Sequence, residues 1–158
     1  MMHTVWVGVL AFVIDRLTKV WAVSWLRVQP GGTYALWPGV LHLTYVQNTG
    51  MAFSLLENHT WLLALITPLA LLLVVVALKY AMRCTTLQNA LLWLLLAGGA
   101  GNLVDRVFYG YVVDFLEIRL FRFAIFNFSD MYLTLAALFL IIALLLTKEE
   151  KDEKRGAA

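Results

Sequence analysis

The chain has 158 residues, of which 62% are hydrophobic and 14% charged, and its formal net charge is +2. Soluble domains carry about one quarter charged residues, and a globule of this length has too little interior to bury so much apolar surface. The composition therefore excludes a soluble domain and favours a membrane protein, and the small net charge argues against a nucleic-acid partner.

Four apolar segments are each close to the roughly 20 residues that a helix needs to cross the hydrocarbon core of a bilayer. They are residues 4–25, 61–78, 84–104 and 131–147. Asp15, Arg16 and Lys19 interrupt the first segment, and the second contains Pro68, which membrane helices tolerate. The sequence therefore predicts an all-α membrane protein, a four-transmembrane-helix bundle formed by a single domain over residues 1–158.

The two connections on one side of the bundle have features of their own. Residues 29–58 start with a segment rich in Pro and Gly and continue into Val40–Val46, where β-branched and aromatic residues predominate. We expect a small extracytoplasmic β-sheet and an interfacial loop in this connection. In the other outer connection, residues 107–130, we expect the stretch 112–120 to dip into the interface. Residues 148–158 are expected to form a cytoplasmic tail.

Basic residues indicate the orientation of the chain, because short cytoplasmic connections of membrane proteins carry an excess of Lys and Arg. One side holds Lys79, Arg83, Lys148, Lys151, Lys154 and Arg155, and the other holds Arg27, Arg119 and Arg122. Both termini are therefore expected in the cytoplasm. With that topology, nearly every ionisable residue outside the tail and the inner connection gathers at the outer face, where we expect a functional site.

Asp114 and Asp130 are the candidate catalytic residues at this face. Two carboxylates held close together share a proton, so one can act as a base toward water while the other donates to a carbonyl oxygen. Spacing alone also allows a structural role, because Asn127 can cap the following helix and Asp130 occupies the acidic position of a capping box. The two roles are compatible: a helix terminus favours an ionised Asp130 and leaves Asp114 as the expected proton holder.

The other polar residues of the predicted spans allow more than one interpretation. Asn102 and Arg106 share a helix face, with Asp105 beside them. They form either a polar wall that orients a substrate or a catalytic carboxylate, or they contribute an Asp105–Arg106 ion pair at the membrane boundary. Asp15 and Lys19 lie four residues apart, and we interpret them as a structural ion pair.

Two groups of smaller residues also stand out. Asn48 and Gly50 are typical of a turn, since both tolerate unusual backbone angles. Three glycines near the end of the third span permit close helix packing; they are Gly98, Gly99 and Gly101.

Several chemistries are not favoured. His3, His42 and His59 are scattered and lack metal-ligand spacing. Cys84 is the single cysteine, which excludes an internal disulfide, and its predicted place on the inner side argues against a cysteine nucleophile. No phosphate-binding loop is present. The sequence thus predicts neither a metal nor an organic cofactor.

Five motifs, in order along the chain, closely resemble those of lipoprotein signal peptidase, the type II signal peptidase family of bacteria. They are DRLTK at 15–19, QNTGMAFS at 47–54, GNLVDR at 101–106, VVDF at 112–115 and FNFSD at 126–130. The resemblance implies an aspartic endopeptidase of the bacterial inner membrane, with its site at the outer face and with no cofactor or metal. It implies that the substrates are prolipoproteins, cleaved just before a diacylglyceryl-modified cysteine.

The resemblance also assigns roles to single residues. It makes Asp114 and Asp130 the catalytic pair, and it gives functional weight to further polar positions and a glycine: Asp15, Asn48, Gly50, Asn102, Asp105, Arg106 and Asn127. Ser129 departs from the family, which usually has Ala there; its hydroxyl could hydrogen-bond near the pair and shift its pKa. We expect a monomer that contacts membrane lipids.

Two other functions would also place carboxylates among helices. A small proton-coupled transporter predicts a carboxylate near mid-membrane and access from both sides. A non-catalytic scaffold predicts that the polar residues only hold the helices together.

Overall fold

The computed structural model describes residues 2–50, 56–81, 85–121 and 123–156. Within these ranges the long helices are α1 (Val5–Ser24), α2 (Thr60–Ala81), α3 (Thr86–Tyr109) and α4 (Phe128–Gly156). The strands are β1 (Thr33–Trp37), β2 (Leu41–Asn48) and β3 (Val112–Ile118), and 3-10 helices cover Met2–Thr4, Leu26–Val28 and Pro30–Gly32. Part of the predicted interfacial loop, residues 51–55, and Cys84 lie outside the described residues.

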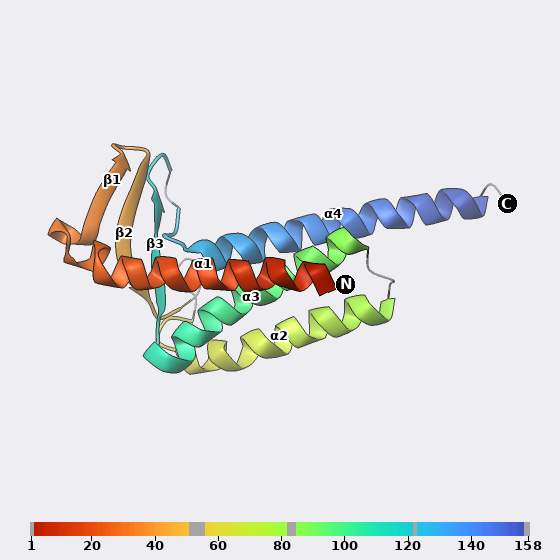
Figure 1. Ribbon diagram of the computed structural model, residues 1–158, viewed down its shortest axis with the longest axis horizontal. Helices are drawn as coiled ribbons and strands as arrows, with labels where there is room; N and C mark the ends of the chain where they lie inside the picture. Colours follow the sequence, from red (N-terminus) through yellow and green to blue (C-terminus); the bar gives the residue numbers. More distant parts are fainter. Residues whose placement is uncertain (1, 51–55, 82–84, 122, 157–158) are drawn as a thin grey trace.

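The helices run roughly side by side, with the sheet at one end of them and both chain termini at the other (Figure 1). α3 is the central helix, because α1, α2 and α4 each pack against it. The four long helices fall on the four apolar segments of the sequence. α4 is longer than its apolar segment and continues to Gly156, through most of the charged tail.

The ends of α3 follow from local side-chain chemistry. The Thr85 hydroxyl accepts a hydrogen bond from the backbone N–H of Gln88, and the Gln88 side chain accepts one from the backbone N–H of Thr85. This capping box satisfies two of the donors that a helix start leaves unpaired. The helix ends where Gly110 takes a left-handed backbone conformation with φ 76°. Asp105 and Arg106 therefore lie on the helix rather than beyond it.

The three strands form one antiparallel sheet in the order β1-β2-β3. The small sheet expected in residues 29–58 is present, and residues 112–120, which we expected to dip into the interface, contribute its third strand, β3. Residues Val112–Phe115 are all buried. A strand that is buried on both faces lacks the alternation of apolar and polar residues that indicates a strand. For this reason the sequence did not predict β3.

A β-bulge changes the pairing of β2 with β3. Leu43 pairs with Leu116, whereas further along Val46 pairs with Asp114, so that three steps on β2 match two on β3. Side chains alternate between the faces of a sheet, and a shift by one residue exchanges the faces. The bulge thus brings the Asn48 side chain to the face that carries Asp114.

The sheet is attached to the end of α1 by a small hydrophobic core. Ala22 and Leu26 pack there against Leu43, Val113 and Phe115. Ala22 and Leu26 are 0% exposed, and Phe115 is 2% exposed. Burial of apolar side chains at this density fixes the sheet, and with it β3, relative to the helices.

Glycines allow α4 to approach α3 closely, as the sequence predicts. A Cβ atom on Gly98 would lie 2.6 Å from the backbone oxygen of Ser129, and one on Gly101 would collide with the Ser129 hydroxyl. A Cβ on Gly99 would collide with Leu71 of α2. Larger residues at Gly98 and Gly101 would therefore push the first turn of α4 away from α3, and a larger residue at Gly99 would displace the Leu71 side chain.

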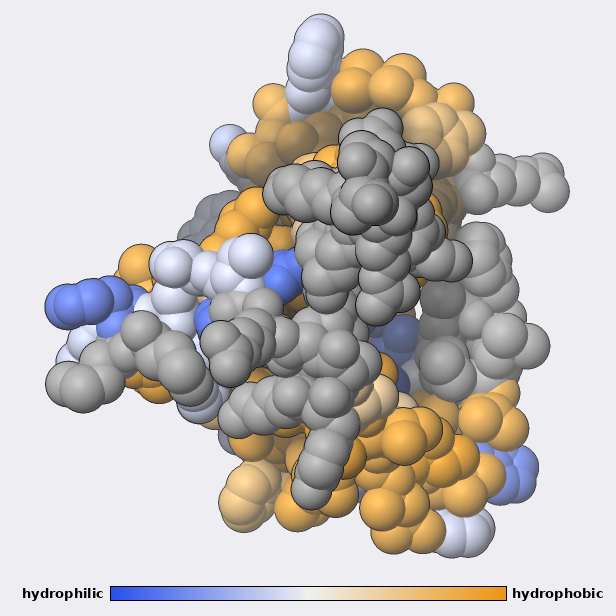
Figure 2. All heavy atoms as spheres, turned by 90° about the vertical axis from the view of Figure 1, so that its right-hand side faces the viewer, coloured by the Kyte–Doolittle hydropathy of each residue, from blue (hydrophilic) through white to orange (hydrophobic). Residues whose placement is uncertain are grey.

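The outer surface of the helices is strongly apolar. Leu73 of α2 is 69% exposed and Phe108 of α3 is 74% exposed. Figure 2, seen from the end with the termini, shows hydrophobic residues over much of the described surface. Among the described residues, the stretch Thr60–Ala77 and the helix Thr86–Tyr109 are long and apolar enough to cross a membrane, and Phe128–Ala143 is a shorter apolar helix.

Candidate active site

Asp114 and Asp130 line one cavity of about 590 Å³ at the junction between the sheet and the helices. Asp114 comes from the middle of β3, and Asp130 from the first turn of α4. The walls are formed by Asn48, Leu63, Thr67, Asn102, Arg106, Val112, Asp114, Ile118, Phe123, Ala124, Ile125, Phe126, Asp130, Met131, Leu133, Thr134 and Leu135. We call Asp114 and Asp130 the carboxylate pair.

Two amides hold the Asp114 carboxylate. Asn48 Nδ2 donates to Asp114 Oδ2 at 2.8 Å, and Asn127 Nδ2 donates to Asp114 Oδ1 at 2.6 Å. Asp114 itself is 1% exposed. Asn48 reaches it from the neighbouring strand only because the β-bulge places both side chains on one face.

Asp130 is held by the start of its own helix and by α3. The backbone N–H of Asn127 donates to Asp130 Oδ2 at 3.1 Å, and Asn127 Oδ1 accepts from the backbone N–H of Asp130 at 3.0 Å. These reciprocal bonds are the predicted capping box, with Asp in the place usually taken by Glu. Asn102 Nδ2 donates to Asp130 Oδ1 at 2.7 Å. Asp130 thus takes part in the cap of its helix and also lines the cavity.

Asn127 joins the two carboxylates. Its side chain is fully buried and bonds Asp114 directly, while its backbone and side-chain oxygen engage Asp130. Its amide nitrogen also lies 3.2 Å from Asn102 Oδ1. Asn48, Asn102 and Asn127 thus arrange three neutral amides around the carboxylate pair, and each amide points its donor at a carboxylate oxygen.

The pKa of Asp114 is raised from 3.8 to about 7, first by burial and then by the nearby charge of Asp130. The hydrogen bonds from Asn48 and Asn127 and the charge of Lys19 act in the opposite direction on this pKa. A carboxyl group with a pKa near neutrality can hold a proton at physiological pH and still release it, as an acid–base catalyst must.

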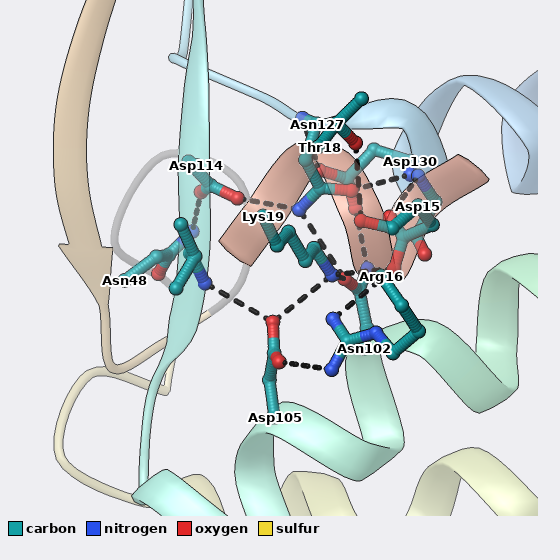
Figure 3. A network of polar contacts seen from close by, with 12 residues as sticks. Asp15, Arg16, Thr18, Lys19, Asn48, Asn102, Asp105, Asp114, Asn127 and Asp130 are labelled. Carbon is teal, nitrogen blue, oxygen red and sulfur yellow. Dashed lines mark hydrogen bonds and ion pairs between the residues drawn. The ribbon is translucent and has the colours of Figure 1, made fainter. Parts of the chain in front are cut away.

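Beneath the carboxylate pair lies a second group of ionisable residues, which we call the charge cluster: Asp15, Arg16, Lys19 and Asp105 (Figure 3). Lys19 Nζ lies 3.2 Å from Asp15 Oδ2 and 3.0 Å from Asp105 Oδ2. Arg16 lies 3.2 Å from Asp15 and 2.7 Å from Asp105. The cluster ties α1 to α3 and contains the predicted Asp15–Lys19 pair.

Arg106 and Gly50 meet at the edge of the cavity. An Arg106 guanidinium nitrogen donates to the backbone oxygen of Gly50 at 2.9 Å, and the backbone N–H of Gly50 donates to Asn48 Oδ1 at 2.9 Å. This second bond is the turn predicted for Asn48 and Gly50, and it fixes the Asn48 amide so that its nitrogen faces Asp114. The alternative of an Asp105–Arg106 ion pair is wrong, because Asp105 pairs with Arg16 and Lys19.

All sequence-predicted site residues therefore lie around one cavity or in the charge cluster directly behind it. The sequence reasoning missed Arg16, although its place one residue after Asp15 on a span is a signal that could have found it. It also allowed that the Ser129 hydroxyl could hydrogen-bond near the carboxylate pair. That hydroxyl is buried and has no hydrogen-bond partner among the described residues.

The described residues contain no group of three or more His, Cys, Asp or Glu side chains that could hold a metal ion. The chemistry that the site offers is acid–base chemistry by two carboxyl groups in a cavity with an apolar wall. Such a pair can activate water toward a bound carbonyl group.

Comparison with known proteins identifies the family of this architecture. Residues 7–146 match the family model described as Signal peptidase (SPase) II. Two proteins named lipoprotein signal peptidase are similar to the chain. That of Gloeothece citriformis is 40% identical over 87% of this chain and 85% of its own. That of Lactococcus lactis is 38% identical over 90% of this chain and 93% of its own.

A solved structure described as a bacterial membrane enzyme, determined by the in meso method at 2.3 Å resolution, superposes with a TM-score of 0.85. It is 28% identical to this chain, and the match covers 96% of this chain and 92% of that one. A second such structure, at 1.9 Å resolution, gives a TM-score of 0.80 at 28% identity and covers 92% of this chain and 94% of that chain. The chain therefore belongs to the signal peptidase II family of peptidases.

Proposed function

We propose that the protein is an aspartic endopeptidase that removes signal peptides from bacterial prolipoproteins, cleaving before the diacylglyceryl-modified cysteine. The observation that carries the proposal is the shared amide of Asn127, which bonds Asp114 and caps the helix turn that presents Asp130. Two carboxylates oriented by one side chain at a cavity wall suit the chemistry of a proton-sharing pair. Membership of the family supports the substrate class.

In the starting state Asp114 holds the proton and Asp130 is ionised. The pKa of Asp114, raised to about 7 mainly by burial, supports its protonated form. The hydrogen bond that Asp130 accepts from the backbone N–H of Asn127 supports the ionised form of Asp130. A water molecule attacks the scissile carbonyl carbon and loses a proton to Asp130, while Asp114 gives its proton to the carbonyl oxygen. The product of this step is a neutral tetrahedral diol.

The diol then collapses. Asp130 passes its proton to the amide nitrogen as the carbon–nitrogen bond breaks, and Asp114 takes a proton from a diol hydroxyl. The starting protonation of the carboxylate pair is restored. Because Asn48, Asn102 and Asn127 donate to these oxygens, they orient the carboxylates for both steps, and Arg106 on the cavity wall is placed to bind a substrate backbone oxygen.

The cavity also suits a lipid-modified substrate. Besides the polar residues, its lining includes Leu63 of α2 and Met131 and Leu135 of α4. Apolar walls on two helices can accept a hydrophobic signal peptide and acyl chains, while the polar wall receives the peptide bond. A peptidase for a membrane-anchored substrate needs both.

We further propose that α1, α2, α3 and α4 all cross the membrane as one domain over residues 1–158, and that the protein acts as a monomer. The charges of α1 do not oppose this, since Asp15 and Lys19 are paired inside the bundle. Residues 29–58 and 107–130 then lie at the outer face with the site. Both termini and the tail 148–158 lie in the cytoplasm, in keeping with their place opposite the sheet (Figure 1).

The test is cleavage of a diacylglyceryl-modified prolipoprotein by purified Asp114→Asn and Asp130→Asn variants. Each substitution keeps the shape and removes the titratable group, so we expect a loss of about 1,000-fold or more in kcat with the thermal unfolding curve unchanged. Glu117→Gln is the matched control, because it removes a carboxylate from the same strand, away from the cavity lining, and should cleave like the wild type.

Retained cleavage in either Asp variant would overturn the aspartic mechanism. A wild-type protein that leaves the lipid-modified substrate intact would overturn the endopeptidase itself. In that case, proton-driven uptake of a solute into proteoliposomes would support the transporter. Absence of uptake would leave the non-catalytic scaffold as the remaining function.

A further inference from the structure

Each member of the carboxylate pair is preceded by a residue whose backbone N–H is bound by a carboxylate of the charge cluster. The N–H of Val113, before Asp114, donates to Asp105 Oδ2 at 3.2 Å. The N–H of Ser129, before Asp130, donates to Asp15 Oδ1 at 3.0 Å. The same arrangement thus occurs on a strand and on a helix start.

Arg16 and Lys19 both connect these two attachments, because each lies within ion-pair distance of Asp15 and of Asp105. Lys19 Nζ lies 3.2 Å from Asp15 and 3.0 Å from Asp105, and it also donates to Asn102 Oδ1 at 2.8 Å. Three acceptors use all three protons of an ammonium group. Lys19 therefore links the segments that carry both candidate catalytic aspartates to each other and to Asn102.

The bond to Asn102 has an additional effect. An amide oxygen that accepts from Lys19 leaves the amide nitrogen of Asn102 to face the other way, and this nitrogen donates to Asp130 Oδ1 at 2.7 Å. Lys19 and Asn127 Nδ2 both donate to Asn102 Oδ1, at 2.8 and 3.2 Å, and together they keep the amide nitrogen of Asn102 toward Asp130. Without Lys19, the longer bond from Asn127 is left to hold that oxygen, so the Asn102 amide is oriented less firmly.

The charge cluster has no net charge, and three of its four residues are buried. It contains two carboxylates and two cations, and Asp15, Lys19 and Asp105 are 0%, 2% and 1% exposed. Buried ion pairs contribute little net stability, because desolvation offsets their attraction. Apolar residues of similar size would hold helices together at least as well. A role in geometry accounts for the cluster better than a role in stability.

We propose that Lys19 is a positioning residue for the reaction: through Asp15, Asp105 and Asn102 it fixes the separation and orientation of the carboxylate pair. The inference rests on the proposed aspartic mechanism. The proposal predicts that Lys19 affects kcat, in addition to any contribution it makes to the packing of α1 in the bundle.

Lys19 also contributes its charge. Asp114 is faced by Lys19 from α1, by Arg106 from α3 and by Asp130 from α4, whereas β2 presents the neutral amide of Asn48. Removal of the ammonium group takes away a positive charge that stabilises the ionised form of Asp114. The pKa of Asp114 then rises, and the alkaline limb of the pH–rate profile, where Asp114 loses its proton, moves to higher pH.

The experiment compares charge-balanced double variants, so that no carboxylate is left without a cation. Asp15→Asn/Lys19→Met removes the donor to Asn102, and Asp15→Asn/Lys19→Gln keeps a donor at the same position. We expect kcat per folded molecule to fall about 10- to 100-fold in the Met variant, with KM within about twofold of the wild type, and to recover in part in the Gln variant. Arg119→Met, which breaks an exposed ion pair on the sheet, is the control for loss of a cation.

The single variant Lys19→Met gives a second readout. We expect its alkaline limb to lie about one pH unit above that of the wild type, and that of the charge-balanced Met variant to shift less. A purely structural Lys19 would lower the unfolding temperature and leave both kcat per folded molecule and the alkaline limb unchanged.

Wild-type kcat in the folded Asp15→Asn/Lys19→Met variant would overturn the proposal. So would failure of both charge-balanced variants to fold, because the cluster would then be required for folding rather than for geometry. Either result leaves the aspartic mechanism untouched as long as Asp114→Asn and Asp130→Asn remain inactive, so the two proposals fail separately.

Discussion

Asn127 uses its whole hydrogen-bonding capacity within the site. Its Nδ2 donates to Asp114 and to Asn102, its Oδ1 accepts from the backbone N–H of Asp130, and its own backbone N–H donates to Asp130. A side chain with every group paired and 0% exposed has one orientation available. The carboxylate pair is therefore oriented before any substrate enters, which lowers the cost of reaching a reactive geometry.

Removal of the Asn48 amide should shift the pH profile without removing a reacting group. Asn48 donates to the ionised form of Asp114 and so lowers its pKa, which burial has raised to about 7. In Asn48→Ala the pKa of Asp114 rises, Asp114 keeps its proton to higher pH, and the alkaline limb of the pH–rate profile moves up. The measurement is kcat against pH on the lipid-modified substrate.

The neighbouring variant Gln47→Ala serves as the control for Asn48→Ala. Gln47 is exposed and its amide donates to the Tyr45 hydroxyl rather than to Asp114. The pH–rate profile of Gln47→Ala should therefore match that of the wild type. An alkaline limb that stays in place or moves to lower pH in Asn48→Ala would contradict the assignment of the proton to Asp114.

At the scale of single residues, the sequence predicts capping well and partner choice poorly. Asn127 and Asp130 form the expected capping box because a capping box depends only on residues three apart. The partner of Asp105 depends on how α1 docks on α3, so the adjacent Arg106 was a misleading candidate. Local spacing contains no information about that docking.

At the scale of elements, the first turn of α4 depends on a glycine of α3. A Cβ atom on Gly101 would lie 2.5 Å from Asp15 Oδ2 and would collide with the Ser129 hydroxyl. Gly101→Ala should therefore lower the free energy of unfolding by about 1–3 kcal/mol, as overpacked sites do. Thermal unfolding of the purified protein in detergent measures this loss.

A double-mutant cycle with Ser129→Ala tests the cause. The Ser129 hydroxyl is buried without a partner among the described residues, so its removal alone should leave stability unchanged or increase it. The cost of Gly101→Ala should be smaller in the Ser129→Ala background, because one of the two collisions is gone. Equal costs in both backgrounds would mean that the Gly101 contact with Ser129 is not the source of the loss.

Among the secondary-structure elements, the sequence pattern predicted the long helices but not the β-bulge. The long helices could be placed because long, predominantly apolar runs indicate them, and α3 continues past its predicted end through Asp105 and Arg106 to Tyr109. The bulge between Leu43 and Val46 has no comparable signal. It is set by the pairing of strands far apart in the sequence, and it decides whether Asn48 reaches Asp114.

For the whole molecule, the proposed orientation predicts which surfaces are accessible from outside the cell. In a Cys84→Ser background, Tyr34→Cys places a thiol on the sheet, where Tyr34 is 48% exposed, and His3→Cys places one near the N-terminus. A membrane-impermeant maleimide applied to intact spheroplasts should label Tyr34→Cys only. His3→Cys should react once the membrane is permeabilised, because the N-terminus is proposed to be cytoplasmic.

The Cys84→Ser protein itself should remain unlabelled under both conditions, which controls for reaction elsewhere. Labelling of His3→Cys in intact spheroplasts, or protection of Tyr34→Cys there, would contradict the proposed orientation. Lipoprotein cleavage by each variant shows that the labelled protein is still correctly assembled.

The family and the set of site residues were more predictable than most of the contacts between them. Five short motifs in order indicated the family, because the residues that surround one site come from α1, β2, α3, β3 and α4. The order of the motifs along the chain does not give the distances between their residues in space. Only the fold shows that the charge cluster lies behind the carboxylate pair and binds the backbone next to each of its members.

The bond between Asp15 and the backbone of Ser129 links residues 114 positions apart, one in the first helix of the chain and one in the last. A ribosome has therefore to complete nearly the whole polypeptide before the two can meet. A nascent chain that lacks its final helix has no Asp130 and no attachment for it. Under the proposed aspartic mechanism, proteolytic competence therefore arises only at the end of biosynthesis, and an unfinished copy in the bilayer cannot cleave its neighbours.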